Sequence, residues 1–97
     1  MKGNKKVALA SVKWDGDTLQ HLSPPMRDDE EVVMTALQTT TERLECLASY
    51  ENKKLKKYLQ YFTFSYQFVS ERLQADPGIQ AVYGRQQKMY KELQARC

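Results

Sequence analysis

The residues of this chain best suited to chemistry are lysines and aromatic residues near its middle. Residues 53–57 read Lys-Lys-Leu-Lys-Lys, and aromatic residues follow closely at Tyr58, Tyr61, Phe62, Phe64 and Tyr66. Lysines interleaved with aromatic residues can bind phosphates and stack bases. The simpler interpretation is a solvated helix face beside core aromatic residues, with the lysine stems lying along apolar surface.

Two of these aromatic residues depart from the helical spacing of their neighbours. One apolar stripe repeats at i, i+3, i+4 and i+7 and is formed by Leu55, Tyr58, Leu59 and Phe62. Tyr61 and Phe64 fall off that stripe, and exposed aromatic residues next to lysines are typical of a protein-binding hot spot. The leading hypothesis is therefore a non-catalytic protein-interaction module, an adaptor or inhibitor that covers a partner's surface. Its predicted contacts are Lys53, Lys54, Lys56, Lys57, Tyr61 and Phe64.

The alternative hypothesis is association with nucleic acid. The same lysines would then bind the phosphate backbone, together with Arg85, Lys88 and Lys91. The formal net charge of +3 is well short of the dense basic patch of a dedicated nucleic-acid binder. Self-association is a third possibility, with Cys97 or the aromatic residues at a symmetric contact.

Patterns for catalysis and for metal binding are weak. His21 is the only histidine, so a mononuclear metal site would need Cys46 or carboxylates brought close to it. His21 and Cys46 occupy one repeat position (46 − 21 = 25), which Phe68 fills in another copy, and this indicates a packing or half-exposed position. Ser23, His21 and Asp17 lie on one short predicted helix, whose side chains point outward and do not converge as a catalytic triad. We expect no enzyme, no metal and no cofactor.

The composition is that of one folded domain. The chain has 97 residues, of which 41% are hydrophobic and 28% charged. No apolar run approaches the roughly 20 residues that span a bilayer, and the basic start, residues 1–7, has no long apolar stretch. The two cysteines, Cys46 and Cys97, form no disulfide framework. We expect a cytoplasmic protein that is neither secreted nor inserted in a membrane.

A short pattern recurs along the chain and sets the predicted architecture. Leu19, Asp29 and Val32 match Tyr66, Asp76 and Ile79 at an offset of 47, and Val7, Leu19 and Leu22 match Val32, Leu44 and Leu47 at an offset of 25. A fixed period in this range is the signature of stacked helical units. We expect an all-α fold, a small helical bundle or short solenoid of about three helix-pair repeats. The predicted units cover about 5–25, 28–50 and 52–73, and a C-terminal capping helix covers about 77–95.

Caps and breakers place the boundaries of the first unit. Asn4 is a possible N-cap for a helix over residues 5–13. Trp14, beside the turn that follows, is either a core residue or a contact residue, and its place beside the turn favours the core. Asp17 is expected to cap a second, short helix. The run Ser23-Pro24-Pro25 is expected to end that helix, because proline lacks a backbone N–H.

The later boundaries follow from similar signals. The acidic run 28–31 predicts a helix N-terminus, and Thr39-Thr40-Thr41 is expected to break that helix. Residues 52–73 could form one long helix, since no Gly or Pro interrupts them, whereas the repeat favours a break near residues 63–65. Asp76 and Pro77 predict the N-cap and first residue of the last helix.

Two stretches resemble a known family of repeats. They read Gly-Asp-Thr-Leu-Gln-His-Leu-Ser over residues 16–23 and Arg-Asp-Asp-Glu-Glu-Val-Val-Met-Thr-Ala-Leu over residues 27–37. Both are similar to the repeat of the family catalogued as domain of unknown function 4116 (DUF4116). The resemblance covers roughly Lys5 to Val82 and weakens at residues 51–57, where basic residues replace acidic ones, and at Thr41, where glycine is expected. It implies tandem helical pairs and carries no catalytic residue, cofactor or substrate.

Overall fold

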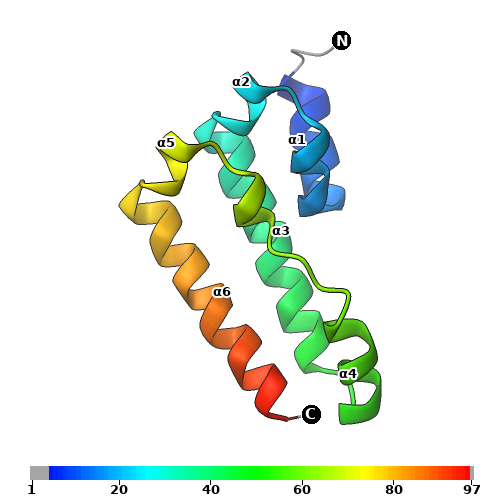
Figure 1. Ribbon diagram of the computed structural model, residues 1–97. Helices are drawn as coiled ribbons and strands as arrows, with labels where there is room; N and C mark the ends of the chain where they lie inside the picture. Colours follow the sequence, from blue (N-terminus) through cyan, green and yellow to red (C-terminus); the bar gives the residue numbers. More distant parts are fainter. Residues whose placement is uncertain (1–4, 97) are drawn as a thin grey trace.

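The computed structural model describes residues 5–96, which form helices and no strand (Figure 1). The order is α1 (Lys5–Trp14), the 3-10 helix η1 (Gly16–His21), α2 (Pro24–Arg27), α3 (Glu30–Ala48), α4 (Asn52–Leu59), the 3-10 helix η2 (Ser65–Phe68), α5 (Glu71–Gln74) and α6 (Pro77–Ala95). The predicted all-α class is confirmed. The predicted N-cap Asn4 and the predicted self-association residue Cys97 lie outside the described residues.

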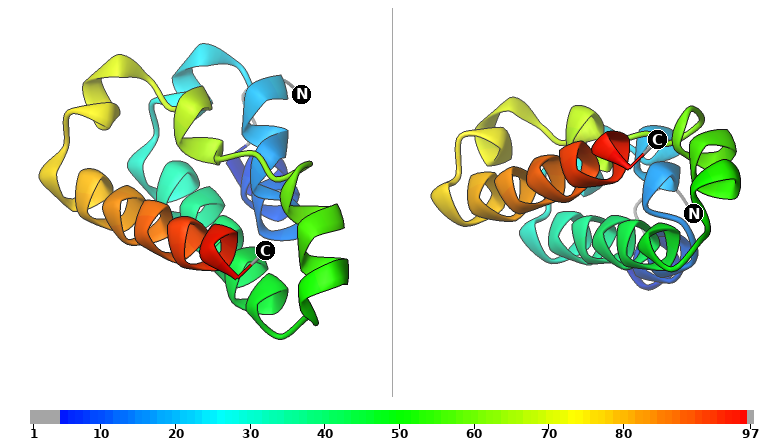
Figure 2. Two further views of the ribbon diagram at one scale, coloured as in Figure 1. Left: turned by 60° about the horizontal axis from the view of Figure 1, so that its bottom comes forward. Right: turned by 90° about the horizontal axis from the view of Figure 1, so that it is seen from below.

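The second half of the chain repeats the order of elements of the first. α2 and α5 begin 47 residues apart (71 − 24), and α3 and α6 also begin 47 residues apart (77 − 30). The long helices α3 and α6 lie side by side (Figures 1 and 2), with α1 beside the N-terminal half of α3 and α4 at its C-terminal end. The sequence offset of 47 therefore corresponds to observed elements.

The threonines at 39–41 do not break α3, and the predicted break is wrong. Each of their hydroxyls donates to the carbonyl oxygen four residues earlier, at 3.0 Å in all three cases. Threonine can satisfy its hydroxyl in this way without leaving the helix. The helix continues from Glu30 to Ala48, so the predicted unit 28–50 contains one long helix and not a helix pair.

The helix before the prolines ends at His21 as predicted, and the prolines themselves begin a further helix, α2, which was not predicted. Ser23 is the N-cap, and Pro24-Pro25 occupy the first positions, where a backbone N–H would have no partner within the helix. The segment before them is η1, which is capped by Asp15. Asp15 Oδ1 accepts from the backbone N of Asp17 at 2.9 Å, so the predicted Asp17 cap is wrong by two residues.

Aspartates cap both long helices. The acidic run 28–31 lies at the start of α3 as predicted, with Asp29 as N-cap. Asp76 is confirmed as the N-cap of α6 and Pro77 as its first residue. Asp76 Oδ1 accepts from Gly78 N at 2.8 Å and from Ile79 N at 3.2 Å.

Residues 52–73 do not form one long helix. α4 ends at Leu59, and the chain is extended at Phe64, with φ −82° and ψ 124°, before η2 begins. Alternate residues of an extended segment point to the same side, so Phe62 and Phe64 both reach α6. Their ring centroids lie 5.6 and 5.3 Å from that of Tyr90. The break near residues 63–65 that the repeat favoured is confirmed, and it begins several residues earlier, at Gln60.

Two groups of buried side chains fill the fold. One joins α1, η1, α3, α5 and the start of α6 through Ala8, Val12, Leu19, Val32, Val33, Ala36, Leu37, Val69, Leu73 and Ile79. The other joins the end of α3, α4 and the end of α6 through Leu44, Leu47, Leu55, Leu59 and Leu93. The described part of the molecule is thin, measuring 41 × 27 × 15 Å along its principal axes. The core is therefore a single layer of side chains.

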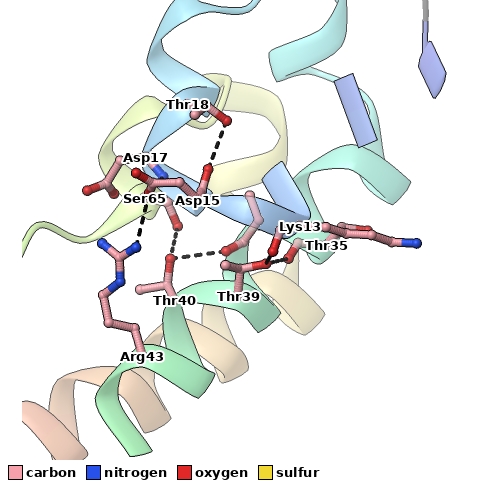
Figure 3. Close-up of polar contacts among 10 residues, drawn as sticks. Lys13, Asp15, Asp17, Thr18, Thr35, Thr39, Thr40, Arg43 and Ser65 are labelled. Carbon is pink, nitrogen blue, oxygen red and sulfur yellow. Dashed lines mark hydrogen bonds and ion pairs between the residues drawn. The ribbon is translucent and has the colours of Figure 1, made fainter. Parts of the chain in front are cut away.

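The elements η1, α3 and η2 meet at Thr40 (Figure 3). Thr40 Oγ1 donates to the Ala36 carbonyl and lies 2.7 Å from Ser65 Oγ, so Ser65 is the donor in that pair. Gly16 approaches the same turn of α3, where an added Cβ would lie 2.6 Å from Ala36 O and 2.7 Å from Thr40 Oγ1. η1 can dock this closely only because residue 16 is glycine.

Gln86 ties α6 to α3. Its side chain is fully buried, and Nε2 donates to Leu37 O at 2.8 Å and to Thr41 Oγ1 at 2.9 Å. Its Oε1 is buried and has no hydrogen-bond partner among residues 5–96. These directional bonds fix the position of α6 along α3, which apolar contacts alone would not do.

An ionic contact joins the short helices α2 and α5. Asp28 accepts hydrogen bonds from the Ser70 hydroxyl and from Arg72 Nε, the latter at 3.0 Å. Arg72 Nη2 also donates to the Asp28 carbonyl at 2.9 Å, and Ser70 N donates to Arg27 O at 3.1 Å. The Ser70 hydroxyl, followed by the Arg72 guanidinium, lowers the pKa of Asp28 below its ordinary value of 3.8. Equivalent turns of the two halves are thereby held together.

The substitution Gly16→Ala is expected to lower the free energy of unfolding by about 1–3 kcal/mol, because its Cβ would overlap the backbone oxygen of Ala36. Gly84→Ala is the matched control. A Cβ there meets nothing within 4 Å, and the change is expected to raise the free energy of unfolding by about 0.5–1 kcal/mol through helix propensity. Urea unfolding followed by circular dichroism measures both values. Effects of the same sign at the two glycines would contradict the close docking of η1.

Acid sensitivity is expected to decrease in Asp28→Asn. A carboxyl whose pKa is lower in the folded than in the unfolded state stabilises the fold above the unfolded pKa, and this contribution is lost as pH falls through the folded pKa. The wild-type protein should therefore lose stability faster than the variant as pH is lowered from about 5 to about 2. Thermal unfolding over that range measures the slopes, with Glu45→Gln, at an exposed residue of α3, as control. Equal slopes for Asp28→Asn and wild type would refute the contribution of this carboxyl.

Candidate interaction site

α4 has one buried face and a basic exposed surface. Leu55 and Leu59 are buried and lie four residues apart, so they share one side of the helix. The remaining sides carry four exposed lysines, Lys53, Lys54, Lys56 and Lys57. The last two lie in the final turn, where the helix dipole favours positive charge. The predicted contact lysines thus form one continuous surface, which we call the α4 basic surface.

The α4 basic surface has no acidic partner within residues 5–96. Ion pairs elsewhere in this part of the chain include those of Lys5, Arg43 and Arg72. No carboxylate of the described residues forms an ion pair with the lysines of α4. At physiological ionic strength, the potential of these lysines extends about 8 Å into solvent before it is screened.

Two tyrosines flank one of the lysines. Lys54 Nζ lies 4.7 Å from the ring centroid of Tyr50 and 6.0 Å from that of Tyr58, and the two rings are 5.6 Å apart. An ammonium over an aromatic face is attracted by the ring quadrupole, by about 0.5–1 kcal/mol at an exposed position. Tyr58 is nevertheless 44% exposed, which was not expected from its place on the apolar stripe. The sequence interpretation missed Tyr50 and Tyr58 as parts of this surface.

The two aromatic residues predicted as contacts differ in exposure. Tyr61 is 73% exposed and stands just beyond the end of α4. Phe64 is half-buried, so its expected exposure is wrong, while its contact with a partner stays a prediction. Its ring packs at 5.0 Å from Phe62, 5.3 Å from Tyr90 and 5.5 Å from Tyr83, so it supports the fold. Phe64 is half-buried because the backbone at residue 64 is extended, and helical spacing could not reveal this.

Trp14 is 87% exposed, so its prediction as a core residue is also wrong. The turn at Asp15 and Gly16 draws η1 against α3 and leaves the last residue of α1 facing outward. Trp14 and Tyr61 lie 47 residues apart (61 − 14): Trp14 is the last residue of α1, and Tyr61 follows shortly after the end of α4. Each half therefore presents one large aromatic side chain to solvent at an equivalent position.

The residues predicted for nucleic-acid contact do not share one surface with α4. Arg85 lines a groove between α3 and α6, together with Glu31, Met34 and Val82. Lys56 instead lines a groove between α4 and α6 with Tyr90 and Gln94. Since successive helix residues are rotated by about 100°, Arg85 and Tyr90 lie on different flanks of α6.

The two remaining nucleic-acid candidates lie on the outer side of α6. Lys88 and Lys91 are exposed, and a helical projection places them opposite the buried residues Gln86 and Leu93. The basic residues of this hypothesis are therefore spread over at least two sides of the molecule.

Arg96 positions the start of α4. Its Nη1 donates to Ala48 O and its Nη2 to Tyr50 O, each at 2.8 Å, while Nε donates to Asn52 Oδ1 at 3.3 Å. Ala48 is the last residue of α3, and Tyr50 lies in the turn between α3 and α4. A residue just past the end of α6 thus fixes the direction in which α4 leaves α3.

An acidic pair lies at the start of η1 (Figure 3). Asp15 Oδ1 is 3.5 Å from Arg43 Nη2, and Thr18 Oγ1 donates to the Asp15 carbonyl at 2.8 Å. Burial, and then the charge of Asp15, raises the pKa of Asp17, while Arg43 acts in the opposite direction. These contacts shape the turn between α1 and η1 and tie it to α3. Nothing in the sequence pattern singled out Arg43.

The side chains with nucleophilic or ligating atoms are dispersed. His21 and Cys46 are both exposed and belong to η1 and α3, and Cys46 Sγ lies 3.9 Å from the hydroxyl of Tyr50. Within residues 5–96, no group of three or more His, Cys, Asp or Glu side chains could hold a metal ion. In the same part of the chain, no helix combines the length and the apolar character that crossing a membrane requires.

Comparison with known proteins supports the family resemblance. Residues 4–50 match the family model described as domain of unknown function (DUF4116). The matched segment contains α1, η1, α2 and α3 and ends well before Val82, the predicted limit of the resemblance. No curated protein and no solved structure matches the chain. Over its first half, the chain is similar to the DUF4116 family.

Proposed function

We propose that this protein is a non-catalytic interaction module that binds an acidic surface of a partner protein through the α4 basic surface. One observation carries the proposal. Four exposed lysines, with no carboxylate partner in the described part of the chain, stand next to the exposed aromatic residues Tyr58 and Tyr61. Aromatic residues provide contact area, and the lysines provide attraction and orientation toward a carboxylate-rich partner.

The packing of α4 holds its four lysines in a fixed arrangement that a partner can bind as one surface. The helix is anchored by Leu55 and Leu59 and by the Arg96 contacts at its start, so the lysines project from a defined backbone. Covering a partner's surface requires no catalytic group. The protein bound here would therefore be either the target of an adaptor or the target of an inhibitor. The groove beside Lys56 gives such a partner a concave place to insert a side chain.

Nucleic acid is the alternative partner. The separation of Arg85 from α4 across α6 counts against a single extended phosphate track. Lysines that bind phosphate backbone without base contacts would also give a steep loss of affinity with salt. The test therefore compares basic residues of α4 with basic residues elsewhere, and it measures binding at two salt concentrations.

The test compares two variants with the same net charge. In the first, Lys53, Lys54, Lys56 and Lys57 are changed to Gln, and in the control, Lys6, Lys13, Lys88 and Lys91 are changed to Gln. All eight lysines are exposed, and glutamine preserves helix propensity. The labelled proteins are titrated with poly-L-glutamate, as an acidic polypeptide, and with mixed-sequence single- and double-stranded oligonucleotides at about 50 and 200 mM salt.

The α4 variant is expected to lose about tenfold or more of its affinity for the acidic polypeptide, while the control loses less than about threefold. Equal losses in both variants would show that only net charge matters and would reject the α4 basic surface. In the oligonucleotide titration both variants remove predicted nucleic-acid contacts, since the control lacks Lys88 and Lys91. Tighter binding to oligonucleotides than to poly-L-glutamate, lost in either variant, would replace the protein partner by nucleic acid. Absence of binding to any probe at the lower salt would reject both.

A further inference from the structure

A second exposed surface, distinct from α4, lies along α1. Val7 is 56% and Trp14 87% exposed, and Ala10 between them is exposed as well. Their spacing of i, i+3 and i+7 places them along one stripe, while Ala8 and Val12 on another side are buried against α3. We call this stripe the α1 flank. Adjoining exposed apolar side chains can mark a protein interaction site.

The corresponding flank of α3 shows what such a stripe can accommodate. At the offset of 25, Val7 corresponds to Val32 (32 − 7) and Trp14 to Thr39 (39 − 14). On α3 the two ends of this flank lie against α1: Val32 is fully buried, and Thr39 Oγ1 lies 3.5 Å from the Lys13 carbonyl. Thr35, which corresponds to Ala10 (35 − 10), is half-buried. The packing of α1 on α3 is therefore an internal example of a helix docked on residues that correspond to the α1 flank.

The charges at the start of the two helices differ in sign. Lys5 Nζ of α1 lies 2.9 Å from Glu31 and 3.3 Å from Asp29, which belong to the first turn and N-cap of α3. At the position of Glu31, α1 itself carries Lys6 (31 − 6 = 25). A helix laid on α1 in the same way would meet Lys6 with its first turn. An acidic residue there would be favourable, whereas a second copy of α1 would bring Lys5 toward Lys6.

We propose that the α1 flank docks an amphipathic helix of a partner protein, whose first turn carries an acidic residue and whose contact face is small and aliphatic. The docking geometry is that of α1 packed on α3. The preference for an acidic residue arises because α1 carries Lys6 at the position that corresponds to Glu31 of α3. Because α1 and α4 pack at different levels along α3, this docking site acts independently of the α4 basic surface.

The test uses a stapled peptide built on α1 itself. The probe has the sequence of residues 4–15 with Lys5→Glu and Lys6→Glu, and a hydrocarbon staple joins positions 10 and 14, which lie outside the face of α1 that contacts α3. The staple is needed because helices this short are marginal in water. The control peptide keeps both lysines. Fluorescence anisotropy measures binding of each labelled peptide to the full chain.

The acidic peptide is expected to bind at least about threefold more tightly than the control peptide. Trp14→Ala in the protein should weaken its binding by about tenfold or more, whereas Tyr61→Ala, at the equivalent exposed aromatic residue of the other half, should not change it. Lys6→Glu should reverse the preference between the two peptides. These residues are exposed, and circular dichroism verifies that each variant remains folded.

Equal binding of the two peptides, or unchanged binding by Trp14→Ala, would overturn the proposal. Sedimentation velocity provides a further check, because a dimer that Trp14→Ala converts to monomer would make a second copy the occupant. Binding of poly-L-glutamate should be unaffected by Trp14→Ala, so failure of the α1 proposal and failure of the α4 proposal give different results.

Discussion

The structure depends on the close approach of two separate segments to one turn of α3. The Thr40 hydroxyl donates to the Ala36 carbonyl and accepts from Ser65. Gly16 lies against Ala36 and Thr40. η1 of the first half docks on this turn through Gly16, and η2 of the second half docks on it through Ser65. The same turn of α3 therefore positions both halves of the chain. The arrangement requires that α3 be continuous there, which the back-bonded threonines permit.

This constraint also decides what is exposed. Since η1 is drawn onto α3 at Gly16, the last residue of α1, Trp14, is left outside. In the second half, the extended segment before Ser65 turns Phe62 and Phe64 toward α6 and leaves Tyr61 outside. The two proposed binding surfaces are thus by-products of the same packing, one an apolar stripe on α1 and the other a basic helix, α4. Neither needs a catalytic group.

Local chemistry in the sequence predicted part of the fold well. The all-α class, the Asp76-Pro77 start of α6 and the offset of 47 depend on caps and spacing, which are local properties. The errors occur where local rules have two solutions. Threonines can leave a helix or satisfy their hydroxyls within it, as they do in α3. Prolines can end one helix and begin the next: η1 ends before Pro24 as predicted, whereas the start of α2 there was missed. The exposure of Trp14 and the burial of Phe64 depend on neighbours distant in the sequence, so spacing could not reveal them.

The most direct test of this account is native-state hydrogen exchange at the amides of Thr39, Thr40 and Thr41. In a continuous α3 with Thr40 buried, these amides should be protected as strongly as those of Val33 to Leu37, opening only with the global unfolding of the domain. If they exchange at the rate of solvent-exposed peptide amides while Val33 to Leu37 remain protected, α3 is broken at the threonines. The common docking point for η1 and η2, and the exposure of Trp14 and Tyr61 that follows from it, would then be wrong.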